Sequence, residues 1–252
     1  MGSAFRDADA LSRLRPVGGR RRGRGTRALG VAGELLITAG LVLALFLGYS
    51  LWWTDVVADR QAGQAAGRLR QSWSAPAPAP DPAEPAPPRY EAGDGLGFLH
   101  VPAMGRDYQV LIRPGTDPGT LDEGVAGVYQ EPYRAAMPWA DSGNFALAAH
   151  RDGHGARFHD LDKVAVGDAV VVETRDSWYV YRVAGTLEQT SKYDTGIIAP
   201  VPERSPFTTA GRYITLTTCT PVYTSRYRMA VWGALVRVDP VDSRRTPPPE
   251  LR

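Results

Sequence analysis

One cysteine and one histidine in this sequence occupy positions suited to nucleophilic chemistry. Cys219 ends the run Tyr213–Cys219, and His150 ends the run Asn144–His150. We read both runs as strands, so each side chain is expected where a strand gives way to a loop, held rigidly and yet exposed. A thiolate can attack a carbonyl carbon, and an imidazole transfers protons near neutral pH. Cys219 is therefore a candidate nucleophile and His150 a candidate proton-transfer group, if the fold brings them together.

Arg228 is the third candidate and supplies a positive charge. It opens the last apolar run, Arg228–Val238, nine residues beyond Cys219. Two strands joined by a loop of that length are expected to be neighbours in a sheet. A guanidinium stays charged and offers five donors in a fixed fork, so it can hold a peptide carbonyl and stabilise an oxyanion. Arg226 is the competing candidate for this role.

The cysteine and the other histidines also have structural interpretations. A lone cysteine can be a small buried hydrophobic residue, and a single one excludes an intramolecular disulfide framework. His154 and His159 could join His150 as metal ligands, but glycines between them oppose a helix and no carboxylate completes a zinc motif. We therefore predict no metal and no cofactor. His100 lies in the first expected strand and is interpreted as structural.

The elements that must position these residues are mostly strands. Helical patterns are scarce, with Leu121–Gly124 and Phe158–Val164 as the candidate turns. The expected strands are Gly97–Val101, Gln109–Ile112, Asn144–His150, Ala169–Thr174, Trp178–Val183, Tyr213–Cys219 and Arg228–Val238. Seven or eight strands without alternating helices predict an all-β domain, either a closed barrel or a sandwich.

An uncharged run, Leu35–Thr54, precedes this domain and is long enough to cross a membrane, at about 30 Å. Residues 1–27 contain eight arginines and two aspartates, whereas the net charge of the whole chain is only +2. This basic segment predicts a cytoplasmic N-terminus, and Trp52 and Trp53 suit the opposite interface. A cleaved secretory signal is the alternative, but its apolar region would be shorter. We predict a single-pass membrane anchor and an extracellular catalytic domain.

A proline-rich segment, Ala75–Arg89, separates the membrane from the domain. Seven of its fifteen residues are proline, which favours an extended spacer. The predicted organisation is a basic cytoplasmic segment (1–28), a transmembrane anchor (29–54), an Ala/Pro-rich extracellular linker (55–93), a catalytic domain (94–240) and a polar tail (241–252). Because the excess positive charge is confined to the first segment, we expect no nucleic-acid partner.

The motifs around the candidate residues resemble those of the sortases, the membrane-anchored cysteine transpeptidases of Gram-positive bacteria. Thr215–Cys219 fits the TLxTC signature of the family, and Arg228 stands where the family's arginine begins the final strand. Asn144–Arg151 is similar to the histidine strand, although many members have glycine at the position of Ala149. The resemblance covers residues 94–238.

The longer segments Tyr213–Pro221 and Tyr227–Gly233 are similar to the class E sortases of actinobacteria. This resemblance implies an eight-stranded β-barrel that cleaves an LAxTG- or LPxTG-like sorting signal between Thr and Gly. It implies a thioacyl intermediate on Cys219 and transfer to an amine of a peptidoglycan precursor or of another protein. His150 is then the general acid and base, and Arg228 holds the substrate and the oxyanion.

The expected partners are secreted proteins that carry a sorting signal. We expect Thr218 and Tyr193 to contact the substrate, the latter from the loop Ser191–Gly211. An exported Cys/His peptidase that hydrolyses its substrate is one alternative, although such enzymes usually place the cysteine at a helix start and before the histidine in sequence. A membrane-anchored binding module with a buried Cys219 and no activity is the other.

Overall fold

The computed structural model describes residues 24–49, 53–74 and 95–252. These residues fall into two units, one ending at Leu47 and one beginning at Gly48. The first unit consists of helix α1 (Arg24–Gly48). Within the described residues, Arg27–Gly48 is the stretch long and apolar enough to cross a membrane, with a mean hydropathy of 2.1. It begins two residues before the predicted anchor (29–54), of which residues 50–52 lie outside the described residues.

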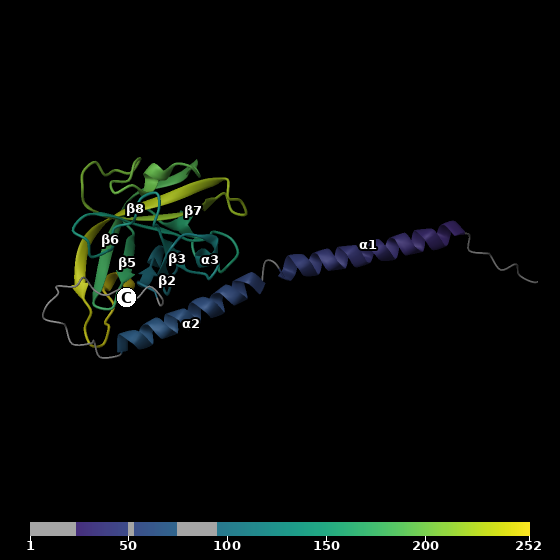
Figure 1. Cartoon of the computed structure of the whole chain (residues 1–252), viewed down its shortest axis with the longest axis horizontal. Helices are drawn as coiled ribbons and strands as arrows, with labels where there is room; N and C mark the ends of the chain where they lie inside the picture. Colours follow the sequence, from purple (N-terminus) through teal and green to yellow (C-terminus); the bar gives the residue numbers. More distant parts are fainter. Residues whose placement is uncertain (1–23, 50–52, 75–94) are drawn as a thin grey trace, which may run out of the picture. The chain divides into compact units, whose positions relative to one another are not determined.

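The second unit contains helix α2 and a β-barrel (Figure 1). The strands are β1 (Gly97–His100), β2 (Gln109–Pro114), β3 (Ala126–Val128), β4 (Gly143–Ala148), β5 (Ala169–Glu173), β6 (Ser177–Ser191), β7 (Arg212–Thr220) and β8 (Tyr227–Pro240). A short helix, α3 (Pro118–Leu121), lies between β2 and β3. Single 3-10 turns cover Pro102–Met104, Leu161–Lys163, Thr195–Ile198 and Pro249–Leu251.

The strands close into a barrel in the order β1-β2-β3-β4-β7-β8-β6-β5. Closure leaves the sheet without an open edge. The pairs β2–β3 and β4–β7 are parallel, and the others are antiparallel. The eight-stranded barrel is therefore confirmed, and it resolves the choice between barrel and sandwich.

Strand β3 was not predicted from the sequence because it is only three residues long and has glycine at its centre. A Cβ atom at Gly127 would lie 2.1 Å from the carbonyl oxygen of Gly115, so only glycine permits this approach. β3 nevertheless completes the barrel between β2 and β4.

The core of the barrel fixes which face of β7 carries the candidate nucleophile. Successive side chains of a strand point to opposite faces. Ile214 and Leu216 belong to the apolar core. Thr215, Thr217 and Cys219 therefore share the other face of β7.

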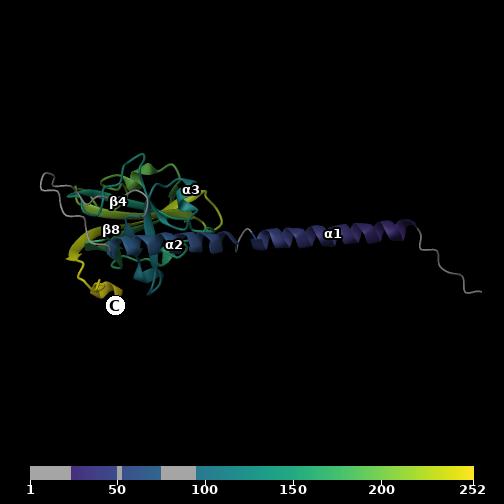
Figure 2. The same cartoon turned by 60° about the horizontal axis from the view of Figure 1, so that its bottom comes forward.

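Helix α2 (Thr54–Ser74) packs on the barrel beside β2 (Figure 2). Its buried residues are Ala58, Ala62, Ala65 and Leu69. Their spacing of four, three and four places them on one helical face. The predicted linker (55–93) thus begins with a helix that is part of the folded unit, and residues 75–94, which include the proline-rich segment, lie outside the described residues.

The predicted polar tail (241–252) is also packed on the barrel. Val241 and Leu251 contact an apolar cluster formed by Val171, Trp178 and Val180. Charged residues add to this docking, because Arg245 bonds to Glu173 and Glu250 bonds to Arg237. The tail therefore belongs to the folded domain despite its polar composition.

Candidate active site

Cys219 and Arg228 lie directly opposite each other on neighbouring strands. In the antiparallel pairing of β7 with β8, Cys219 is the register partner of Arg228. Directly opposed residues of an antiparallel pair project their side chains to the same face, with Cβ atoms about 4.5–5.5 Å apart. Cys219 is partly exposed and forms no disulfide. Cys219 is thus partly exposed and paired with an arginine, unlike a fully buried structural cysteine.

His150 follows β4, which pairs in parallel with β7. The last register pair is Ala148 with Thr217. A further bond from the Ala149 amide to the Thr217 carbonyl, at 3.3 Å, extends the contact past the end of β4. Carried two residues beyond the last pair, the register sets His150 beside Cys219. The fold therefore brings the predicted histidine, cysteine and arginine to adjacent strand ends.

Asp122 is a site residue that the sequence analysis missed. Its Oδ1 lies 2.8 Å from Nε2 of His150 and 3.7 Å from Nδ1 of His154. The two imidazole rings pack together, with centroids 5.3 Å apart. The side chains of Asp122 and His150 remain 43% and 27% exposed. An ionised carboxylate only accepts hydrogen bonds, so Nε2 of His150 carries the proton in this pair.

Tyr129 follows β3 and contacts β7 close to the candidate nucleophile. Its hydroxyl is 3.0 Å from Oγ1 of Thr217, which is two residues before Cys219 on the same face of β7. Burial raises the pKa of Tyr129, and the hydrogen bond to Thr217 and the charge of Arg228 only partly offset this effect. The charge of Cys219 also raises the pKa of Tyr129. A neutral phenol therefore borders the pair Cys219–Arg228.

Thr218 and Tyr193, the residues expected to contact substrate, differ sharply in exposure. The side chain of Thr218 is buried, and its hydroxyl donates to the carbonyl of Ala149 at 2.8 Å. Thr218 thus ties β7 to the segment that leads into His150, and its hydroxyl is not available to a peptide. Tyr193 is 78% exposed, and the ammonium of Lys192 lies 5.1 Å from its ring centroid.

Arg228 keeps unused hydrogen-bond donors, whereas the side chain of Arg226 lies over the ring of Tyr227. The hydrogen bonds of Arg228 within the described part of the chain both come from Nη1, to the carbonyls of Ser225 and Tyr227. Its Nε and Nη2 remain for a ligand. Arg226 is exposed, precedes the first residue of β8, and lies over the ring of Tyr227 at 5.3 Å.

The other histidines are engaged elsewhere. Nδ1 of His159 is 3.0 Å from the carbonyl of Arg151, and Nε2 of His100 is 3.0 Å from Glu173. In the part of the chain that the structure describes, no group of three His, Cys, Asp or Glu side chains could hold a metal ion. His150, His154 and His159, which the sequence analysis weighed and did not favour as metal ligands, are not such a group.

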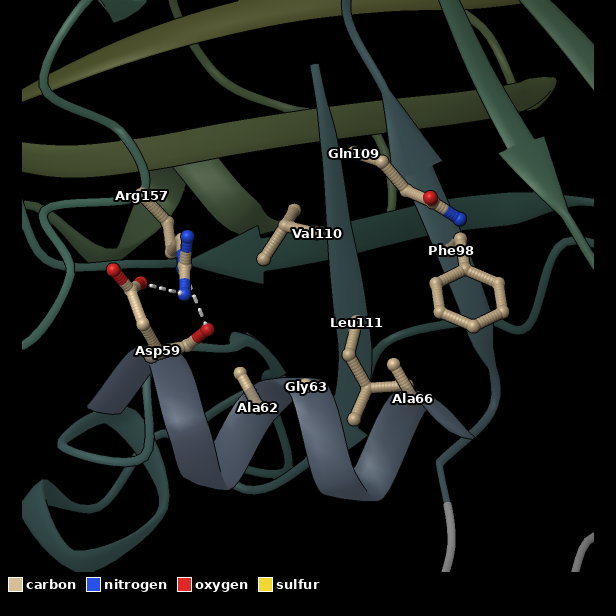
Figure 3. Close-up of a pocket in the computed structure, with 10 residues that line it drawn as sticks. Asp59, Ala62, Gly63, Ala66, Phe98, Gln109, Val110, Leu111 and Arg157 are labelled. Atoms are coloured by element: carbon tan, nitrogen blue, oxygen red, sulfur yellow. Dashed lines mark hydrogen bonds and ion pairs between the residues drawn. The ribbon is translucent and has the colours of Figure 1, made fainter. Parts of the chain in front are cut away.

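A cavity of about 390 Å³ lies away from these residues, between α2 and the barrel (Figure 3). It is lined by Asp59, Ala62, Gly63, Ala66, Phe98, Gln109, Val110, Leu111, Gly124 and Arg157. It contains none of the three predicted catalytic residues, which follow β4, end β7 and begin β8.

Comparison with known proteins agrees with this geometry. The family model "Sortase domain" matches residues 99–236, which is more than half of the chain. Sortase SrtE2 of Streptomyces coelicolor is 53% identical over 237 residues, covering 93% of each protein. Sortase SrtE1 of the same organism is 42% identical over 235 residues, which are 91% of this chain and 64% of that protein.

Solved structures give the same result for the barrel. The crystal structure of sortase E1 from Streptomyces coelicolor, with a tripeptide in its active site, matches with a TM-score of 0.59 and 44% identity, covering 63% of this chain and 96% of that one. Sortase E from Streptomyces avermitilis matches with a TM-score of 0.57 and 32% identity, covering 65% and 100%. The chain therefore belongs to the sortase family of transpeptidases, and it is similar to the class E sortases of Streptomyces.

Proposed function

We propose that this sortase cleaves an LAxTG-like sorting signal between Thr and Gly at Cys219, and transfers the acyl group to an amine. The observation that carries the proposal is the register of the barrel, which pairs Cys219 with Arg228 and ends the neighbouring strand β4 two residues before His150. The relative sortase E1 of known structure binds a tripeptide in its active site, which supports a peptide substrate here.

The first step forms the thioacyl enzyme. The thiolate of Cys219 attacks the carbonyl carbon of the substrate threonine, and the carbonyl oxygen becomes an oxyanion. The bond between that carbon and the glycine nitrogen then breaks, and the nitrogen takes a proton from the imidazolium of His150. The products are a Cys219 thioester and a free glycine amine.

The second step reverses these roles. An acceptor amine attacks the thioester carbon and gives a proton to neutral His150, and the carbon–sulfur bond breaks to restore the thiolate. Because Nε2 of His150 donates to Asp122, its Nδ1 is the nitrogen that releases and accepts the proton. The hydrogen bond to Asp122 holds the orientation of the His150 ring, which suits the step that protonates the leaving amine.

Arg228 serves the oxyanion. Its free donors, Nε and Nη2, can bond the developing negative charge, and the guanidinium stays charged at any pH at which the enzyme folds. Its position opposite Cys219 favours it over Arg226.

The proposed setting is the outer face of the cell membrane. The arginine-rich segment 1–27 supports retention of the N-terminus in the cytoplasm, and α1 supplies the span. The barrel then meets secreted proteins that carry a sorting signal, and amines of peptidoglycan precursors or of other proteins. Protease digestion of intact cells tests this orientation, because the barrel should be cleaved and the N-terminal segment protected.

A peptide assay tests the proposed reaction. LAxTG and LPxTG peptides are incubated with the full chain, with and without a glycine-based amine, and the products are identified by mass spectrometry. We expect a peptide–amine conjugate, faster turnover of the LAxTG peptide, and no product from Cys219→Ala. Release of acid alone, with no conjugate at high amine concentration, would support the hydrolase instead.

A thiol-alkylation assay separates the enzyme from a non-enzymatic binding module. The partly exposed Cys219 should react with iodoacetamide in the folded protein. A folded protein that resists alkylation, and that leaves every peptide intact, would favour the binding module.

A further inference from the structure

The N-terminal half of helix α2 contacts the loop that begins with His150. Oδ1 of Asp55 accepts a hydrogen bond from the amide of Gly155 at 2.8 Å. Nη2 of Arg157 donates to Oδ1 of Asp59 at 2.6 Å. Figure 3 shows Arg157 extending from this loop toward Asp59 on the helix. Two carboxylates of α2 therefore bind the His150 loop at points five and seven residues beyond the histidine.

The backbone of this loop requires such support. Four successive residues have positive φ angles, namely Gly153 (60°), His154 (48°), Gly155 (78°) and Ala156 (40°). This conformation is strained for residues with a Cβ atom, and it persists only where the surroundings enforce it. The amide that Asp55 binds lies between the two non-glycine residues, His154 and Ala156. The ring of His154 in turn packs on that of His150.

Arg157 also connects α2 to the segment that carries Asp122. Its Nε donates to the carbonyl of Gly124 at 2.8 Å, two residues after Asp122. Ala58 of α2 packs against the same place, because a Cβ atom on Gly124 would lie 3.2 Å from the Cβ of Ala58. Helix α2 therefore contacts the loop that follows His150, and it contacts Gly124, which follows Asp122.

We propose that α2 is a positioning element of the active site, and that Asp55 and Asp59 hold the His150 loop and the Asp122 turn in register with Cys219. This inference rests on the proposed function. Helix α2 ends at Ser74 and so lies outside residues 99–236, which the sortase-domain model matches. A segment next to the membrane thus sets the geometry of the catalytic histidine.

If α2 only stabilised the fold, loss of the Asp59 charge would not change the rate of the reaction in a folded protein. α2 is also held by its apolar face, and at its other end Arg70 lies 3.7 Å from Glu173. The side chain of Asp59 is 60% exposed, and an exposed ion pair contributes little to global stability. Loss of the Asp59 charge should therefore leave the fold intact and disturb only the loop that it holds.

The test compares the two ends of α2 in the full chain, purified in detergent micelles. Asp59→Asn removes the ion pair at the His150 loop, Arg157→Gln removes that pair and the bond to Gly124, and Arg70→Gln is the control on the same helix. We expect kcat to fall roughly tenfold for Asp59→Asn and further for Arg157→Gln, with KM changed less than about twofold. Arg70→Gln should keep the parent kcat.

Two further measurements exclude a general loss of structure. The imidazole signals of His150 in proton–nitrogen spectra should move in Asp59→Asn and not in Arg70→Gln, while both variants keep a cooperative unfolding transition. Asp59→Glu, which retains the charge, should restore most of kcat. Equal kcat values for Asp59→Asn, Arg70→Gln and the parent would overturn the inference. The proposed function fails separately, if the parent itself yields no conjugate that depends on Cys219.

Discussion

Two regions of the barrel contain the same three kinds of side chain in different surroundings. At the end of β4, His150 bonds to Asp122, and Arg228 is the arginine of this region. At the end of β1, His100 bonds to Glu173, and Arg245 is the arginine of that region. The carboxylate–imidazole distances are similar, at 2.8 and 3.0 Å. The exposed fractions of the carboxylates are not, at 43% for Asp122 and 2% for Glu173. Of the two pairs, the first lies at the end of the strand that neighbours β7, which carries Cys219.

The hydrogen-bond partners of the two carboxylates explain their different exposure. Glu173 is shared among His100, Arg245 and Arg70, and Arg245 also donates to the carbonyls of Thr174 and Arg175. Such a network joins β1, the C-terminal tail and α2, and a fully satisfied buried network rigidifies the fold. The exposed pair keeps one imidazole nitrogen and the donors of Arg228 available. The same residue types therefore stabilise the fold in one region and suit chemistry in the other.

The largest contrast should come from the two histidines. His150→Ala removes the general acid and base, so turnover should fall by about three orders of magnitude, while the protein still unfolds cooperatively. His100→Ala should keep kcat and lower the free energy of unfolding. Peptide-transfer kinetics and thermal unfolding of both variants check this. An inactive His100→Ala that folds normally would break the comparison.

The two arginines should differ in the same way, by a smaller factor. Arg228→Ala should lose about 100-fold in kcat because the oxyanion loses its donor. Arg245→Ala should retain kcat and unfold at lower temperature, since it binds Glu173 and the backbone. Arg226→Ala is the control next to the site, and a greater loss of kcat for it than for Arg228→Ala would reverse the assignment.

Glu173 should give a pH signature in stability. Burial raises its pKa, but hydrogen bonds from His100 and Arg245 and the charge of Arg70 outweigh burial and hold the pKa below its ordinary value of 4.5. The native state therefore binds fewer protons than the unfolded state, so this contribution is complete above that value and is lost as the pH falls below it.

Glu173→Gln removes this contribution and should cost about 2 kcal/mol of unfolding free energy at neutral pH, because the partly exposed Arg245 and Arg70 lose their charged partner. Denaturant unfolding of the parent and of the variant, from about pH 6 down to about pH 3, measures the gap. We expect the gap to narrow with falling pH. A gap that stays constant would contradict the role assigned to the carboxylate.

The smallest effect is expected at Asp122. Asp122→Asn keeps the size of the side chain and weakens the hydrogen bond that orients the His150 ring, so kcat should fall roughly tenfold and KM should change little. The unfolding temperature should stay close to that of the parent, because the pair is exposed. A large loss of stability in Asp122→Asn would make this pair resemble that of Glu173.

The sequence predicted seven of the eight strands, because each of them is an apolar run bounded by turn residues, and it set Cys219 and His150 at the end of such runs and Arg228 at the start of one. Asp122 was missed because it is 28 residues from His150 and only the closed barrel brings them together. Tyr129 was missed for the same reason, since its partner Thr217 is 88 residues away. Long-range pairs of this kind leave no local periodicity in a sequence.

The packing of α2 was also missed, for a different reason. Three of its four buried residues are alanines, at 58, 62 and 65, and the segment leads into a linker that is itself rich in alanine. Small side chains give a weak hydrophobic contrast between the faces of a helix. The docking of the C-terminal tail was missed because the tail is polar, and ion pairs to the barrel are among the contacts that hold it.

Trapping the thioacyl enzyme tests the central claim most directly. The full chain is mixed with an LAxTG peptide without added amine, quenched in acid within seconds, digested and analysed by mass spectrometry. The account predicts an adduct on Cys219 whose mass equals the peptide up to the threonine carbonyl, with little or none in His150→Ala. Cleavage of the peptide without any adduct on Cys219, or at an unchanged rate in Cys219→Ala, would contradict it.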